Sequence, residues 1–156
     1  MDRKFMDLAI IEAKKAAENG EVPVGAIIVK NGEVIASGRN RREELHSALC
    51  HAECEAINNA CNTVNDWRLE DCELYVTLEP CPMCAGAIIN ARIPTVVFGA
   101  YDTKAGAMGS VADLGGMPFG FEPEVYGGIC ENECKELLSN FFKTVRAPVK
   151  KGENNG

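Results

Sequence analysis

Residues 72–91, which read CELYVTLEPCPMCAGAIINA, contain the change of secondary structure that decides the fold. Positions 72–78 are rich in β-branched and aromatic residues and predict a strand. Glu79 and Pro80 end this strand, and Pro82 suits the first position of a helix, where the missing N–H of proline costs nothing. The helix expected over 82–91 is mostly small and apolar, so we expect it to be buried.

The rest of the chain continues this alternation of strands and helices. Apolar periodicity and turn residues predict helices at 2–18, 51–61 and 131–146, a short helix within 104–114, and strands at 22–29, 33–37, 95–98 and near Val125. Asn31-Gly32 is a strong hairpin signal between the first two strands, and residues 38–50 are expected to form a loop. This order predicts an α/β fold, a three-layer α-β-α sandwich with a mixed sheet of about five strands, parallel where helices connect them.

Length and composition exclude several classes of protein. The 156 residues are 46% apolar and 25% charged, which is ordinary for a globular protein and unlike a disordered or fibrous chain. We expect one domain over residues 1–146 and a disordered tail over 147–156. No uncharged run approaches the ~20 apolar residues that span a membrane, and residues 1–15 lack the pattern of a signal peptide. We therefore expect a cytoplasmic protein whose eight cysteines are thiols.

Two short segments carry the residues that indicate chemistry: His51-Ala52-Glu53 opens one expected helix, and Pro80-Cys81-Pro82-Met83-Cys84 opens another. Cys81 and Cys84 share one face of a first helical turn, where the helix N-terminus favours the thiolate. With a neutral imidazole from His51 they form an N,S,S donor set for zinc. Three protein ligands leave a fourth position for water, as in catalytic zinc sites. Glu53 need not bind the metal, and we expect it to accept a proton from that water.

Each segment has a simpler interpretation when it is taken alone. A lone C-x-x-C pair also occurs in zinc ribbons and in redox pairs, and His-Ala-Glu is also an ordinary helix start. We favour the catalytic zinc because both segments occur together, each at the beginning of a helix. Cys50 and Cys54 flank the ligand region and either compete for the metal or pack as small apolar residues, and we favour packing.

The pattern H-x-E…P-C-x-x-C is the signature of zinc-dependent nucleobase deaminases. Over residues 5–146 the chain resembles one family more specifically, the bacterial tRNA-specific adenosine deaminases of the cytidine deaminase-like superfamily. The matching blocks are Val22-Pro23-Val24-Gly25-Ala26, Gly38-Arg39-Asn40-Arg41, residues 74–88, Val97-Phe98-Gly99-Ala100, Asp102, Lys104-Ala105-Gly106-Ala107 and Leu137-Leu138-Ser139-Asn140-Phe141-Phe142.

The resemblance implies a cytidine deaminase-like fold and makes residues 1–146 a single zinc-dependent deaminase domain. It implies one Zn²⁺ per subunit, with His51, Cys81 and Cys84 as ligands and Glu53 as the catalytic residue that carries the proton. The implied reaction is hydrolytic deamination of the wobble adenosine to inosine in a tRNA anticodon, performed by a homodimer.

The resemblance also implies two substrate-binding residues. Asn40 would hydrogen-bond the flipped base, and Asp102 would lie near the sugar of the neighbouring nucleotide. Without the resemblance, Asn40 is equally a turn residue and Asp102 a solvated loop charge.

Two features depart from the resemblance. The family usually has His-Asp-Pro-Thr-Ala before the zinc-binding histidine, whereas this chain has His46-Ser47-Ala48-Leu49-Cys50, in a loop that borders the pocket. His46 either lines that pocket or simply lies in the loop. The net charge of −7 disfavours a nucleic-acid partner. A local rim of cations would answer this objection, and the candidates are Arg39, Arg41, Arg42, Arg92, Lys104, Lys143, Arg146, Lys150 and Lys151.

Two other functions stay open at this point. A deaminase of a free nucleobase or nucleotide (guanine, cytosine or dCMP) uses the same zinc chemistry, and the acidic charge favours it. A catalytically silent, zinc-stabilised binding module belongs to a different class of protein, and it would have no need of Glu53.

Overall fold

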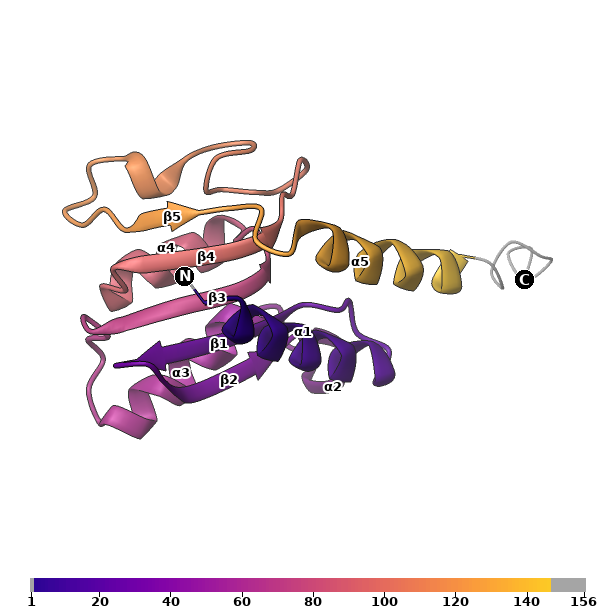
Figure 1. Ribbon diagram of the computed structural model, residues 1–156, viewed down its shortest axis with the longest axis horizontal. Helices are drawn as coiled ribbons and strands as arrows, with labels where there is room; N and C mark the ends of the chain where they lie inside the picture. Colours follow the sequence, from indigo (N-terminus) through magenta and orange to yellow (C-terminus); the bar gives the residue numbers. More distant parts are fainter. Residues whose placement is uncertain (1, 147–156) are drawn as a thin grey trace.

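Five strands form one mixed sheet in the order β2-β1-β3-β4-β5 in a computed structural model, which describes residues 2–146 (Figure 1). The strands are β1 (Gly25–Lys30), β2 (Glu33–Arg39), β3 (Cys72–Leu78), β4 (Thr95–Ala100) and β5 (Glu124–Tyr126). β1 is antiparallel to both neighbours, whereas β3, β4 and β5 run parallel. The predicted mixed sheet is therefore confirmed.

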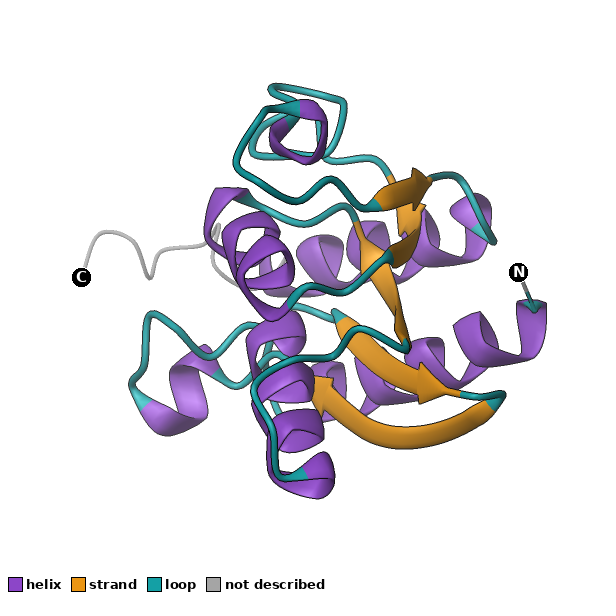
Figure 2. Cartoon of the chain, turned by 90° about the vertical axis from the view of Figure 1, so that its left-hand side faces the viewer, coloured by secondary structure: helices purple, strands orange, loops and turns teal. Residues whose placement is uncertain are grey.

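Helices cover both faces of this sheet, as Figure 2 shows. The helices α1 (Arg3–Glu18) and α5 (Glu131–Arg146) pack on one face, and α3 (Ala52–Val64) and α4 (Pro82–Ala91) pack on the other. The short helix α2 (Arg42–Leu45) lies between β2 and α3 in the chain. The predicted three-layer α-β-α sandwich is confirmed.

The central strands are continuous apolar runs because both of their faces are buried. Leu74 and Val76 of β3 point into the core beneath α3 and α4, together with Val96 of β4. The alternate residues Tyr75 and Val97 join the core beneath α1 and α5. This alternation follows from the two-residue period of a strand, and it is typical of sheets covered on both sides.

The predicted hairpin is present between β1 and β2. Asn31 and Gly32 both have positive φ angles, 52° and 78°, as the two central residues of a type I′ turn require. Lys30 pairs with Glu33 across the turn. The turn fixes the register of β2 and therefore the point at which Asn40 leaves the sheet.

Two predicted boundaries of secondary structure in the N-terminal half of the chain are wrong. The first strand begins at Gly25 rather than at position 22, because Pro23 has no N–H with which to pair. The stretch 38–50 is only partly a loop, since β2 continues to Arg39 and α2 follows at Arg42–Leu45.

The helix predicted within 104–114 is also wrong, because that stretch consists of turns, with a short 3₁₀ helix only at Leu114–Gly116. Side chains take the backbone N–H groups that a helix would use. Asp102 accepts hydrogen bonds from the N–H groups of Lys104 and Ala105, as an N-cap residue does at a single turn. Further along, Glu79 accepts those of Met108 and Ser110 and so stops a helix from continuing. Such side-chain acceptors compete directly with helical hydrogen bonds.

The predicted tail at 147–156 lies outside the described residues. Within residues 2–146, none of the helices combines the length and the apolar character that crossing a membrane requires. All eight cysteines fall in this part of the chain and are free.

Candidate active site

The N-termini of two helices meet at one point and bring three metal-ligating side chains together. His51 is the N-cap residue of α3, and Cys81 is the N-cap residue of α4, with Cys84 one turn further on. Neither residue caps its helix with its side chain, so the imidazole and the thiol are free to face the site. His51 Nδ1 lies 3.6 Å from Cys81 Sγ and 3.5 Å from Cys84 Sγ.

These distances fit a single zinc ion. Ligand bonds of roughly 2.3 Å to sulfur and 2.0 Å to nitrogen, set at the tetrahedral angle, place the nitrogen about 3.5 Å from each sulfur. All three ligand atoms lie within 4.8 Å of one another. Two thiols and an imidazole are also the donor types that zinc prefers. The cluster therefore fits one Zn²⁺ per chain, and a tetrahedral ion held by three residues has one position left for another molecule.

The sulfur atoms of the cluster do not hold their protons equally. A hydrogen bond from Cys84 lowers the pKa of Cys81 to about 3, so Cys81 is a thiolate at neutral pH. Hydrogen bonds to Cys54 and Cys81 raise the pKa of Cys84 above that of an ordinary thiol. Because zinc binds cysteine as the thiolate, Cys84 would have to release its proton to serve as a ligand.

Glu53 lies in the first turn of α3 and is only 4% exposed. Burial raises the pKa of its carboxyl group to about 7. A carboxyl group that titrates near neutrality can both accept and release a proton at working pH, which is what general acid–base catalysis needs. The hydrogen bond to Cys81 likewise raises the pKa of His51.

A cavity of about 230 Å³ opens beside the cluster. It is lined by residues of several separate segments: Val22, Val24, Asn40, Arg42, His51, Ala52, Glu53, Leu78, Glu79, Cys81, Asp102 and Ala105. Five of the six predicted site residues are among them, and the sixth, Cys84, is buried beside His51. Sites for whole small molecules usually measure about 300–1,000 Å³, so this cavity suits one group of a larger ligand.

Asn40 and Asp102 each hydrogen-bond the backbone and also line the cavity. Asn40 is 6% exposed; its amide donates to the carbonyl of Val22, and its side-chain oxygen accepts from the N–H of Arg42. Asp102 uses Oδ1 to accept from the N–H groups of Lys104 and Ala105. The turn role and the pocket position therefore coexist in both residues.

Sequence reasoning missed two buried glutamates: Glu79, which lines the cavity, and Glu21, which precedes the cavity residue Val22. Glu21 accepts hydrogen bonds from the N–H groups of Glu43 and Glu44, at 3.1 and 2.7 Å, and so fastens the start of α2. Glu79 fastens the loop that follows β4. The sequence offers one signal that could have found them, which is a glutamate close to a proline. Glu79 directly precedes Pro80, and Glu21 stands two residues before Pro23.

Part of the predicted cationic rim lies at the cavity. Arg42 lines it, and Lys104 is exposed two residues after Asp102. Arg41 instead pairs with Glu44 and Glu55, at 2.9 and 2.7 Å.

Other predicted rim residues lie elsewhere. Arg92 is at the C-terminal end of α4, away from the N-terminus that carries Cys81. His46, for which the sequence left open a place in the pocket lining or simply in the loop, follows α2 as its C-cap residue, is exposed and is not among the cavity residues. Lys150 and Lys151 fall outside the described residues.

Cys54 lies close to the cluster without completing it. Its sulfur is 3.8 Å from Cys84 Sγ, yet the group of atoms that fits one ion contains only His51, Cys81 and Cys84. The packing interpretation of Cys54 agrees with this placement, and Cys50 and Cys54 are both half-buried, the first just before α3 and the second within it.

Two converging helix starts with this donor set, beside a carboxyl group that titrates near pH 7, define a zinc-dependent hydrolase. Residues 1–100 match the profile of the cytidine and deoxycytidylate deaminase zinc-binding region. The chain therefore belongs to this family of zinc-binding deaminases.

Within this family, the chain is similar to proteins that act on tRNA. A tRNA-specific adenosine deaminase of Bacillus subtilis (strain 168) is 48% identical over 155 residues, which covers 99% of this chain and 96% of the relative. The tRNA-specific adenosine deaminase of Aquifex aeolicus (strain VF5) is 48% identical over 142 residues, 91% and 94% of the two chains.

Solved structures agree with these relatives. A structure from a study of A-to-I editing by tRNA:A34 deaminases superposes with a TM-score of 0.85 at 45% identity, covering 88% of this chain and all of the other. A guanine deaminase from Bacillus subtilis has a TM-score of 0.63 at 38% identity and covers 74% of each chain.

Proposed function

We propose that this protein hydrolyses the amino group from the wobble adenosine of tRNA anticodons and leaves inosine. The observation that carries the proposal is the 230 Å³ cavity lined by Glu53 and by two residues of the metal cluster, His51 and Cys81, a volume below that of usual sites for whole small molecules. Relatives 48% identical over nearly the full chain are tRNA-specific adenosine deaminases. A polynucleotide can place one flipped base in such a cavity while the remaining nucleotides stay on the surface.

His51, Cys81 and Cys84 would hold the zinc ion beside the cavity, whose lining includes His51 and Cys81. When bound, zinc supplies a Lewis acid that acidifies a water molecule for attack at neutral pH. Glu53 accepts one proton of that water as the oxygen bonds to the carbon that carries the amino group, and gives the proton to the adjacent ring nitrogen. Glu53 then moves the remaining hydroxyl proton to the amine, and ammonia leaves as the C–N bond breaks. The pKa of about 7 suits both transfers.

Asn40 and Asp102 contact different parts of the substrate in this proposal. Asn40 faces the cavity and hydrogen-bonds the flipped base, while its links to Val22 and Arg42 keep the amide in place. Asp102 lies near the sugar of the neighbouring nucleotide. The exposed charges of Arg42 and Lys104 contact phosphates outside the cavity. These contacts let an acidic protein bind RNA locally.

The proposal includes a homodimer that forms through the outer face of α3 and α4. Helix α4 is apolar or small on its exposed side as well, at Met83, Gly86 and Ala87, although a helix that is apolar all round is normally buried all round. A groove of about 1030 Å³ runs along this face. Leu49 and Phe119 line it and are 66% and 57% exposed. A second copy of the chain would cover these apolar side chains.

Light scattering of wild-type protein and of Ala87→Arg tests the dimer. We expect the mass of two chains for the wild type and of one chain for the variant, because the added charge faces the groove. A wild-type mass of one chain at all concentrations would contradict the dimer. The proposal also treats residues 1–146 as one deaminase domain. We propose that the protein works in the cytoplasm, a reducing compartment in which its eight free cysteines stay reduced.

A free-base deaminase is the second candidate, and the superposition on a guanine deaminase favours it. One experiment separates the two. Zinc-loaded protein is incubated with an anticodon stem-loop that carries the wobble adenosine, and separately with guanine, cytidine and dCMP. We expect inosine in the stem-loop and no ammonia from the small molecules. Ammonia from a small molecule with an unchanged stem-loop would overturn the proposal.

A further inference from the structure

Glu79 is a buried carboxylate that receives four hydrogen bonds from a single loop. Its side chain is 1% exposed. Oε1 accepts from the N–H of Asp102 at 3.0 Å and from the hydroxyl of Ser110 at 2.5 Å. Oε2 accepts from the N–H groups of Met108 and Ser110, both at 3.0 Å. The charge is buried at low cost because these donors replace water.

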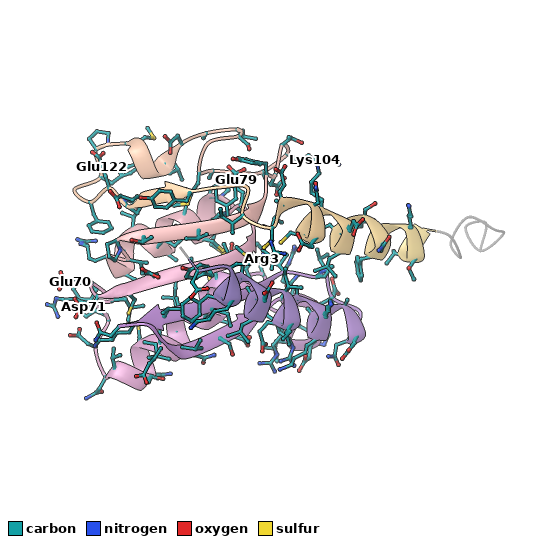
Figure 3. All side chains as sticks on the ribbon, viewed as in Figure 1. Arg3, Glu70, Asp71, Glu79, Lys104 and Glu122 are labelled. Atoms are coloured by element: carbon teal, nitrogen blue, oxygen red, sulfur yellow. The ribbon has the colours of Figure 1, made fainter. Side chains whose placement is uncertain are left out.

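The position of Glu79 connects two walls of the cavity. Glu79 directly follows β3 and stands two residues before Cys81, whereas all four donors belong to residues 102–110, after β4. That loop contributes Asp102 and Ala105 to the cavity. Figure 3 labels Glu79 and Lys104 near each other, close to the start of α5, whereas Glu70 and Asp71 lie at the opposite end of the sheet. The carboxylate thus ties the loop to the strand end that leads into the metal ligands.

We infer that Glu79 is a positioning residue, which holds the 102–110 loop against the end of β3 and so sets the width of the substrate cavity. The inference rests on the proposed function and assigns a role within that site. Glu79 acts through Asp102 and Ala105, since its own acceptor positions are occupied by the loop. It is outside the cluster of metal-ligating atoms.

The contacts require a carboxylate and not merely a polar side chain. Each oxygen faces a backbone N–H, so both ends of the group must accept. A glutamine would present an NH₂ group to one of these N–H groups, and that contact would become repulsive. Backbone donors cannot turn away, unlike the Ser110 hydroxyl.

Gly106 supplies a second, independent observation. A Cβ atom at this position would overlap the carboxyl group of Glu79 and the carbonyl oxygen of Asp102. The loop therefore lies so close to Glu79 that only glycine fits between them. Gly106→Ala pushes the two apart without changing the chemistry of the carboxylate.

The test compares Glu79→Gln, Gly106→Ala and Ser110→Ala with a matched control, Glu73→Gln. Glu73 lies on β3, at the end away from Glu79, and among residues 2–146 its side chain accepts a hydrogen bond only from the Tyr75 hydroxyl. Two measurements are made on zinc-loaded protein: hydrogen exchange of the 102–110 amides, and kcat and KM for the stem-loop. Zinc content is measured for each variant.

We expect Glu79→Gln and Gly106→Ala to speed exchange of the Asp102, Met108 and Ser110 amides at least about tenfold, as the loss of one or two hydrogen bonds would. KM should rise about tenfold with kcat changed less than threefold, which is the signature of lost substrate binding. Ser110→Ala should change both quantities in the same direction but less, and Glu73→Gln should change neither. Zinc content should stay at one per chain.

Two results would overturn the inference. Unchanged amide exchange would show that Glu79 does not hold the loop, and faster exchange with an unchanged KM would show that the loop position does not matter for the substrate. A fall in kcat alone would indicate a loss of active protein and also count against it. If the wild type does not deaminate the stem-loop, the proposed function fails. Amide exchange would still show whether Glu79 holds the 102–110 loop in place. If Glu79→Gln does not fold, Gly106→Ala and Ser110→Ala decide.

Discussion

The Nδ1 atom of His51 lies 3.5 Å from the Sγ atom of Cys84, although 33 positions separate the two residues in the chain. His51 begins α3, and Cys84 lies in the first turn of α4, so two packed helices set this distance. It is also the distance that one tetrahedral zinc ion imposes on its nitrogen and sulfur ligands. Because the fold preorganises the donor set, metal binding should depend on the three ligands and little on their neighbours.

Replacing one cysteine at a time distinguishes the cysteines that bind zinc from those that only lie near the ion. Cys84→Ala should lower zinc affinity by more than about 100-fold, beyond the effect of losing a residue that merely supports a ligand. Cys54→Ala should keep one zinc per chain, since Cys54 is outside the cluster that fits the ion. Elemental analysis of dialysed protein measures both. Zinc loss in Cys54→Ala with retention in Cys84→Ala would reverse the assignment.

Glu53→Gln should keep the metal and lose the reaction. Glutamine has the shape of glutamate but cannot carry a proton, so turnover should fall by about 10²–10⁴, the usual contribution of general acid–base catalysis. Stem-loop binding should change little. Measuring zinc content, stem-loop affinity and single-turnover rate on the same preparation checks all three. A variant that deaminates at the wild-type rate would remove Glu53 from the mechanism.

Alkaline pH should destabilise the protein partly through Cys134. Burial raises the pKa of this thiol to about 12, above the value of 9.0 for an unperturbed thiol. A raised pKa in the folded state means that the stabilisation is complete below pH 9 and is lost as pH rises towards 12, because the unfolded chain releases its proton first. Cys134→Ala should therefore lose stability less steeply over this range, by about 1.4 kcal/mol per pH unit.

Urea unfolding at a series of pH values from 8 to 11 measures this slope, with reductant present throughout. Cys50→Ala is the matched control, since it removes a thiol that is less buried. If the stability of wild type and of Cys134→Ala fell equally steeply with pH, Cys134 would not be a source of the alkaline destabilisation.

Salt should weaken RNA binding through a small number of phosphate contacts. Arg42 lines the cavity, and Lys104 is exposed beside it. Each phosphate contact with single-stranded nucleic acid contributes about 0.7 to the slope of log affinity against log salt. Arg42→Ala and Lys104→Ala should each reduce that slope by about this amount, whereas Arg92→Ala, at the far end of α4, should leave it unchanged. Unaltered slopes in the first two variants would place the RNA elsewhere.

The sequence predicts the strand-to-helix units well because their signals are local. The strand at Cys72–Leu78 and the helix at Pro82–Ala91 have the predicted bounds. The β-branched and aromatic residues of 72–78 indicate the strand, and Pro82 marks the start of the helix. The turn at Asn31-Gly32 is equally local, since both residues must adopt positive φ. Convergence of His51 with Cys81 follows from placing two helix starts at one end of the sheet.

What the sequence does not predict depends on long-range contacts. The helix expected within 104–114 fails because Glu79, 29 residues before Met108, accepts backbone hydrogen bonds that a helix would otherwise make. The cationic rim is reduced for the same kind of reason. Arg41 pairs with Glu55, which is 14 positions away on α3, and nothing in the local sequence announces that ion pair.

The central claim is that one zinc ion is held by two sulfurs and one nitrogen of this chain, with one position left for the reaction. X-ray absorption at the zinc edge of wild-type protein measures the coordination directly. We predict two sulfur neighbours at about 2.3 Å and two lighter neighbours at about 2.0 Å. Three or four sulfur neighbours, which would bring in Cys54, or a preparation without stoichiometric zinc, would contradict the account.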